Sequence, residues 1–129
     1  MSNWTDLLRD AAPIKAIYGL HLPTLEGIDL HEICLHRDGP RALLRFDLKD
    51  FPSFPPKKWS SSGFNRVQIR LCATDVQSVK LEGLGKNMVL DLAVVKDGAR
   101  VRLRADNGVV RFDMRATSVF VETVSAYKE

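Results

Sequence analysis

The last third of the chain, "NMVLDLAVVKDGARVRLRADNGVVRFDMRATSVFVETVSAYKE" (residues 87–129), decides the fold. Apolar and polar residues alternate along most of this segment, which is typical of β-strands with one buried face. Asp97-Gly98 and Asn107-Gly108 interrupt the alternation, and both dipeptides favour two-residue hairpin turns. The segment therefore predicts successive antiparallel strands.

Taken as two-residue loops, these turns also predict the register. Val94 then faces Val101, and Leu103 faces Phe112, all on one face that also carries Leu92. A slip by one residue would invert every side chain, so the agreement across both turns supports this assignment. The opposite face receives Asp91 against Arg104, Arg102 against Asp113, and Arg100 against Arg115. The final strand is expected to carry Val119 and Val121 inward, and Phe120 and Glu122 outward.

The segment "DLHEICLHRDGPRALLRFDLKD" (residues 29–50) predicts another hairpin, around Asp38-Gly39. If the turn pairs Leu35 with Ala42, Glu32 lies opposite Arg45 as an opposite-charge pair. "RVQIRLCA" (66–73) reads as the next strand, and "VKLEG" (79–83) as its partner.

A helix signal stands at the start of the chain. Asn3 or Ser2 is a suitable N-cap for a short helix with Trp4 on its apolar face, and Pro13 limits its length. The expected fold is mainly β (α+β), with this short helix followed by about seven or eight antiparallel strands in a meander-like curved sheet or sandwich. No linker or repeat divides residues 1–129, so we expect a single domain.

Composition narrows the class of protein. Of 129 residues, 45% are hydrophobic and 27% are charged, which is an ordinary globular balance. The net charge of +3 does not by itself indicate nucleic-acid binding. The sequence has no membrane-spanning apolar run and no secretory signal at its start. Two cysteines, Cys34 and Cys72, form no disulfide framework, so we expect a cytoplasmic protein with reduced thiols.

Groups that carry catalytic chemistry are few. The sequence has no nucleophile elbow, phosphate loop or His-Glu-x-x-His motif. Glu32, Cys34 and His36 would project from one strand face, but a zinc site needs a further ligand and orienting groups. We therefore interpret this row as structural and expect no catalytic, cofactor-binding or metal-binding residue.

Two surfaces are candidates for binding a partner. Arg100, Arg102 and Arg104 would cluster on the polar face of the terminal sheet, where guanidinium groups suit carboxylate or phosphate recognition, although we favour the simpler interpretation of a solvated face neutralised by Asp91, Asp113 and Glu122. The second surface is the loop "FPSFPPKKWSSSGFN" (residues 51–65), which its prolines hold extended. We expect Trp59 to pack on the sheet and Phe54 and Lys57 to remain available to a partner.

The same loop carries a family resemblance. The proline-proline-x-x-tryptophan run at Pro55, Pro56 and Trp59, with Asn65 after it, belongs to a pattern that spans residues 4–128 and includes "GIDLHEICLHRDGP" and the terminal "VFVETVSAYK". This order resembles the immunity protein 50 family of bacterial polymorphic toxin systems. Pro55, Pro56, Trp59 and Asn65 are then structural motif residues.

The resemblance implies the function of a non-enzymatic immunity protein. Such a protein binds and blocks a cognate toxin domain by stoichiometric inhibition, without a cofactor. The alternative from the residues is a small-ligand or carbohydrate-binding β module, with Trp59 and Phe54 lining a pocket. Neither membrane nor nucleic acid is an expected partner, and the sequence leaves homo-oligomerisation open.

Overall fold

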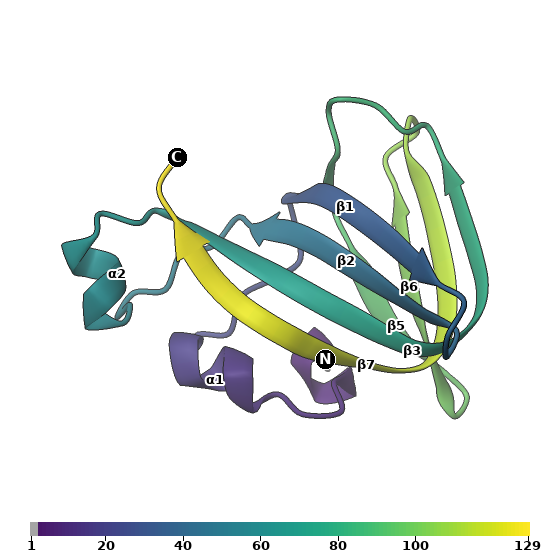
Figure 1. The fold of residues 1–129 in the computed structure, drawn as a ribbon, viewed down its shortest axis with the longest axis horizontal. Coiled ribbons are helices and arrows are strands. Elements are labelled where there is room, and N and C mark those ends of the chain that lie inside the picture. The colour runs from purple at the N-terminus through teal and green to yellow at the C-terminus, as the bar shows by residue number, and fades with distance from the viewer. Residues whose placement is uncertain (1–2) are drawn as a thin grey trace.

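A computed structural model describes residues 3–129 and shows one seven-stranded antiparallel sheet (Figure 1). The predicted mainly β fold class is therefore confirmed. The strand order is β4-β1-β2-β3-β7-β6-β5. The strands are β1 (Ile28–His36), β2 (Arg41–Leu48), β3 (Arg66–Glu82), β4 (Val89–Leu90), β5 (Ala93–Asp97), β6 (Arg100–Asp106) and β7 (Arg111–Tyr127).

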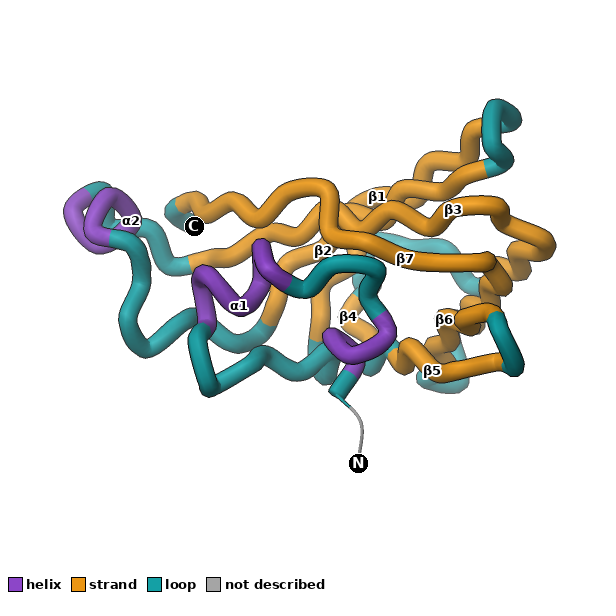
Figure 2. The backbone as a smooth tube through the Cα atoms, turned by 90° about the horizontal axis from the view of Figure 1, so that it is seen from below, coloured by secondary structure: helices purple, strands orange, loops and turns teal. Residues whose placement is uncertain are grey.

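The sheet is strongly curled, and a short stretch of chain joins its two edge strands. β4 and β5 are the two edge strands, yet only residues 91–92 separate them in the sequence. β3 and β7, each 17 residues long, bend through the middle of the sheet (Figure 2). Their pairing shifts register twice, between Arg70 and Leu71 and between Val76 and Ser78, and such bulges increase bending. The fold is a single curled sheet and not a two-sheet sandwich.

One strand assignment was wrong. The segment "VKLEG" is not the partner of residues 66–73 but the continuation of the same strand, β3. The chain turns without leaving the sheet because Asp75 adopts φ 52° and the adjacent bulge absorbs the bend. The partner of both halves is β7, from Arg66 opposite Tyr127 to Glu82 opposite Arg111. That long-range pairing has no local signal in the sequence.

The hairpin registers are partly as predicted. Leu35 faces Ala42 and Glu32 faces Arg45, as expected. In the terminal hairpins the pairing is shifted by two residues, so that Leu103 faces Val94 and Met114, and Phe112 faces Ala105. The shift arises because the turns differ from those predicted.

The turn at Asn107 shows the physical cause of the shift. The Asn107 side-chain oxygen accepts hydrogen bonds from the backbone N–H groups of Val109 (2.9 Å) and Val110 (2.7 Å). This stabilises a longer loop, with Asp106 as the last residue to pair with β7. A two-residue shift leaves every side chain on its predicted face, so Leu92, Leu103 and Phe112 are buried as expected, as are Val119 and Val121.

The N-terminal region forms two short helices in place of one. Asn3 caps a 3₁₀ turn, η1 (Trp4–Leu7), with its side chain accepting from the Thr5 N–H at 3.0 Å. Ser2, the alternative cap, lies outside the described residues. Pro13 does not end the first helix but lies in the first turn of a second, α1 (Ala12–Tyr18), because proline fits a helix start.

The core lies on the inner face of the curled sheet. Ile14 and Tyr18 of α1 join the same buried cluster as Phe46, Ile69 and Leu103, so η1 and α1 cover part of this face. Figure 2 shows α1 lying beside β7. The outer face carries the polar and charged residues of the strands, and it contains the candidate sites. In residues 3–129, no helix combines the length and the apolar character needed to span a membrane.

Candidate functional site

The densest polar cluster lies on the outer face, around Asp47 at the end of β2. Asp29 of β1 lies opposite Asp47, and Gln68 of β3 lies opposite it on the other side. A β-bulge between Leu30 and Glu32 keeps His31 beside them. The side chain of Tyr127, from the end of β7, completes the group. The cluster thus contains side chains from four strands, and Asp47 at its centre is only 3% exposed.

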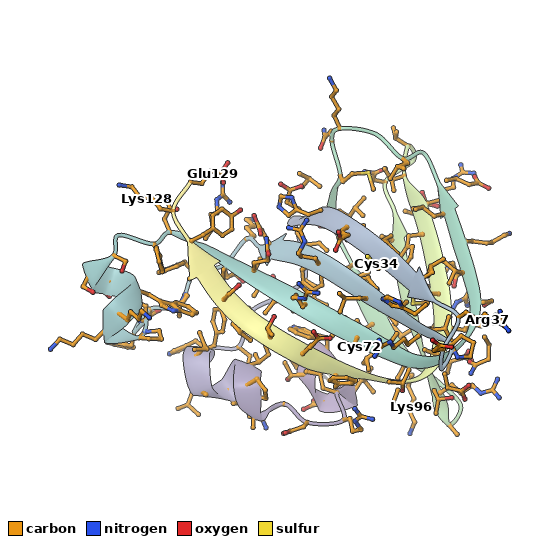
Figure 3. All side chains as sticks on the ribbon, in the orientation of Figure 1. Cys34, Arg37, Cys72, Lys96, Lys128 and Glu129 are labelled. Carbon is orange, nitrogen blue, oxygen red and sulfur yellow. The ribbon has the colours of Figure 1, made fainter. Side chains whose placement is uncertain are left out.

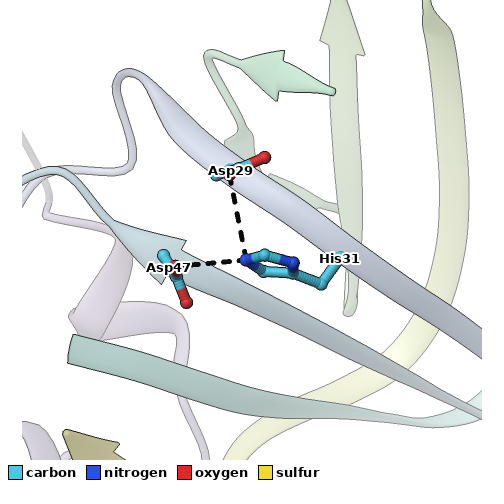
Figure 4. Close-up of side chains that lie close together, drawn as sticks. All are labelled: Asp29, His31 and Asp47. Carbon is cyan, nitrogen blue, oxygen red and sulfur yellow. Dashed lines mark ion pairs between the residues drawn. The ribbon is translucent and has the colours of Figure 1, made fainter. Parts of the chain in front are cut away.

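Three donors satisfy this buried carboxylate. Tyr127 donates its phenolic O–H to Asp47, and Gln68 Nε2 donates to Asp47 Oδ1 at 3.1 Å. His31 Nε2 lies 3.1 Å from Asp47 Oδ2 and 3.8 Å from Asp29 Oδ2 (Figure 4). We name Asp29, His31, Asp47, Gln68 and Tyr127 the Asp47 cluster.

The cluster lowers the pKa of Asp47 and raises the pKa of Tyr127. Burial raises the pKa of the Asp47 carboxyl, but hydrogen bonds from Tyr127, Gln68 and His31 outweigh burial and lower it overall. Burial and the hydrogen bond to Asp47 raise the pKa of Tyr127 to about 12. At neutral pH the cluster therefore holds an ionised Asp47 against a neutral phenol.

The same residues are the part of the described chain that best suits a metal ion. One ligand atom from each of Asp29, His31 and Asp47 lies within 4.8 Å of the others. A cation at that point would displace the donors of Tyr127 and His31 from Asp47, because those donors occupy the same oxygen. The geometry is thus that of a closed hydrogen-bond network. Sequence reasoning missed the cluster, since only the alternate spacing of Asp29 and His31 was visible.

The row of Glu32, Cys34 and His36 lies on the outer face as predicted. Glu32 contacts Arg45 at 3.7 Å. Burial, and then the hydrogen bond to Glu32, raise the pKa of the Cys34 thiol, which opposes the thiolate form that reacts as a nucleophile. Cys34 and Cys72 are free thiols two strands apart (Figure 3), separated by Leu43 of β2.

The predicted arginine surface exists on the outer face of β6, but much of its charge is neutralised. Asp113 accepts hydrogen bonds from Arg102 Nε at 2.9 Å and from Arg102 Nη2 at 2.5 Å, and Arg104 Nε lies 3.9 Å from it. Asp113 therefore has a lowered pKa, chiefly because of its hydrogen bonds with Arg102. Arg100 has no carboxylate within 4.0 Å in the described part of the chain. A cleft of about 480 Å³ lies beside Arg104.

The aromatic loop, residues 51–65, has one part packed on the core and one part exposed, as the sequence suggested. Part of the loop is helical. Residues Lys57–Ser61 form α2, so the prediction of a wholly extended segment was wrong. Pro56 precedes this helix, and its carbonyl accepts from the Trp59 N–H at 2.9 Å. The Trp59 ring is half-buried, lies 6.2 Å from the Phe51 ring and packs against the core. Phe54 is 88% exposed, and Lys57 is exposed.

Asn65 ties the end of this loop to the end of the chain. Its backbone N–H donates to the Tyr127 carbonyl at 3.0 Å, and its side chain exchanges hydrogen bonds with the backbone of Glu129 at 3.3 and 2.9 Å. These contacts hold β3 and β7 together beside the Asp47 cluster. Pro55, Pro56, Trp59 and Asn65 thus occupy positions suited to the structural role predicted for them.

A family model, described as Immunity protein 50, matches residues 10–127. The chain belongs to this family. The match includes the Asp47 cluster, the aromatic loop and the whole curled sheet. Membership confirms the resemblance inferred from the sequence and indicates a toxin-neutralising immunity function, which implies a toxin protein as the partner.

Comparison with solved structures supports the fold of this Immunity protein 50 member. A crystal structure of an uncharacterized protein from Neisseria gonorrhoeae superposes with a TM-score of 0.50 and 14% sequence identity. The alignment covers 75% of this chain and 91% of that one. At this identity the likeness shows a shared fold alone. A search of curated proteins found no match.

Proposed function

We propose that this protein binds a cognate bacterial toxin domain and neutralises it by stoichiometric inhibition, without turnover. The observation that carries the proposal is the family match over residues 10–127. In this proposal the protein is a cytoplasmic, non-enzymatic single domain of residues 1–129, and the toxin is its protein partner.

The aromatic loop is the first candidate surface for that partner. Phe54 is 88% exposed, while Trp59 and Phe51 anchor the loop to the core. An exposed aromatic side chain on an anchored segment is ordered at little entropic cost on binding. Lys57, exposed at the start of α2, would favour an acidic patch on the toxin and speed association. The arginine surface of Arg100, Arg102 and Arg104 is the second candidate.

The rival function, a small-ligand or carbohydrate-binding module, has less support from the loop. Trp59 packs on Phe51 and the core, and Phe54 projects into solvent. Neither ring lines the cleft beside Arg104 or either of two further clefts in the described part of the chain. This arrangement gives little support to a shared stacking platform for a sugar.

Co-purification with the toxin domain encoded beside the gene tests the proposal. The wild-type protein should form a one-to-one complex and protect cells that express the toxin. Phe54→Ala combined with Lys57→Glu should leave the melting curve nearly unchanged while weakening both binding and protection.

The matched control makes the same chemical change elsewhere. Leu20 is 98% exposed and Lys15 is exposed on α1, so Leu20→Ala with Lys15→Glu should not affect the complex. If the Phe54 and Lys57 variant binds as tightly as the control, the loop is only structural, and charge reversal at Arg100 and Arg104 is the next test. If the wild-type protein forms no complex, the proposed function is wrong.

A further inference from the structure

The curled sheet leaves a window between two unpaired strand edges. On one side, β1 pairs with β4 only at Ile28 and Asp29, so no strand of the described chain, residues 3–129, pairs with residues 31–36 on the edge opposite β2. On the other side, β2 leaves β3 at Thr74, and beyond it β3 pairs only with β7. The two edges run on either side of one opening in the sheet (Figure 1).

Hydrogen bonds hold this window at two of its corners. The Val76 N–H donates to the Pro40 carbonyl at 2.9 Å, which joins the β1–β2 turn to the bend in β3. The Leu30 N–H donates to the Met88 carbonyl at 3.0 Å, which joins the start of β1 to the loop of residues 83–88. The frame of the opening is therefore part of the folded sheet.

The window opens onto a cleft that has both apolar and polar walls. The cleft measures about 480 Å³, and Ile33, Leu81 and Leu84 line it beside the polar side chains of Asp29, Glu32 and Lys86. Leu84 is 75% exposed, and Leu35, which lies on the same face of β1 as Ile33, is 61% exposed. Exposed apolar side chains beside an open strand edge favour pairing with another strand.

We propose that an extended strand of the toxin adds to the free edge of β1 and inserts its apolar side chains into this cleft. An edge strand leaves alternate backbone N–H and C=O groups unpaired, and only another extended backbone satisfies them in series. A small molecule would fill the cleft but leave that edge unpaired. This inference rests on the proposed function and names the mode of toxin binding.

The charges at the cleft indicate the character of that strand. Asp29 already has the His31 imidazole as a neighbour at 3.8 Å, and Glu32 has the guanidinium group of Arg45 at 3.7 Å. Lys86 also lines the cleft and, within residues 3–129, has no carboxylate within 4.0 Å. The strand that fits is therefore apolar at alternate positions, with an acidic residue placed to meet Lys86.

The free edge of β5, a terminal strand of the sheet, is less suited to strand addition. β5 pairs only with β6, but the η1 turn lies against it. The apolar side chain on the outer face of β5, Val95, is 42% exposed, less than Leu35 of β1. β5 thus offers a matched control edge within the same protein.

Hydrogen exchange on the complex with the neighbour-encoded toxin domain, inactivated by mutation, tests the inference. The amides of residues 31–36 that face the open edge should exchange at least tenfold more slowly in the complex, while those of β5 should not change. Leu35→Lys should weaken binding by about tenfold or more, because it removes one apolar side chain from the interface, with little change in melting temperature. Leu20→Lys, at a side chain that is 98% exposed, should bind as wild type.

Each other outcome overturns the inference in a different way. A complex whose protection is confined to residues 51–65 or to β6 leaves the immunity function intact but refutes strand addition at β1. If the edge-facing amides of residues 31–36 are already protected in the isolated protein, and Leu35→Lys converts a dimer to a monomer in sedimentation, the occupant is a second copy of this chain. If the wild-type protein forms no complex, the proposed function and this inference both fail.

Discussion

Tyr127→Phe should destabilise the protein in a pH-dependent way, because the lost hydroxyl donates to an ionised, buried carboxylate. Its acceptor, Asp47, is 3% exposed and has a lowered pKa, since hydrogen bonds from Tyr127, Gln68 and His31 outweigh the effect of burial. The substitution removes one of these donors and leaves the ring in place.

The size of the effect follows from the charge of the acceptor. A hydrogen bond to a charged group contributes about 1.5–3 kcal/mol to stability, against about 0.5–1.5 kcal/mol for a neutral pair. Tyr127 is half-buried, so we expect a loss near the lower end, about 1.5–2 kcal/mol at pH 7. Tyr18→Phe is the matched control, since the Tyr18 hydroxyl donates at 2.7 Å to the neutral carbonyl of Asp50.

The pH dependence has a definite sign. The folded pKa of Asp47 is lowered, so its contribution is present above the unfolded pKa of about 4 and is lost as pH falls through the folded value. The difference between wild type and Tyr127→Phe should therefore shrink in acid. Because the folded pKa of Tyr127 is raised to about 12, the difference should also shrink as pH rises from about 10 towards 12.

Urea unfolding curves at a series of pH values, for both variants and the wild type, give the required free energies. The Tyr18→Phe loss should be smaller and constant between pH 4 and 8, roughly the range in which neither partner titrates. The reasoning is refuted if Tyr127→Phe costs no more than Tyr18→Phe, or if its cost does not change in acid.

Three further experiments test the packing. Leu103→Ala should cost about 2–5 kcal/mol in a denaturant melt, because Leu103 is fully buried, and Arg102→Ala on the opposite face should cost far less; the reverse order would contradict the face assignment. Trp59→Ala should cost about 1–3 kcal/mol, below the range for a fully buried aromatic because the ring is half-buried; no loss of melting temperature would mean that Trp59 does not anchor the loop. Gly83→Ala should cost more than Gly98→Ala, since both have positive φ but only Gly83 would place a Cβ 1.8 Å from a facing carbonyl; similar thermal melts for the two would exclude that clash.

Of the candidate sites, the aromatic loop is the one that could be predicted from the sequence in most detail. The exposure of Phe54 and the anchoring of Trp59 followed from the prolines and aromatics of one contiguous loop. The Asp47 cluster did not, because its members come from four strands and depend on the bulge that sets the position of His31. The window beside β1 was equally hidden, since it depends on where β2 leaves β3.

The sequence by itself determined which face of the sheet each strand residue occupies, approximately where the hairpins lie, and the family. Alternation has a period of two, so the faces survived even where the terminal pairing shifted by two residues. Tertiary structure alone decided that residues 66–82 form one strand and that β7 is its partner. That pairing joins segments distant in the chain, and its stability comes from packing over the whole core, which no local pattern encodes.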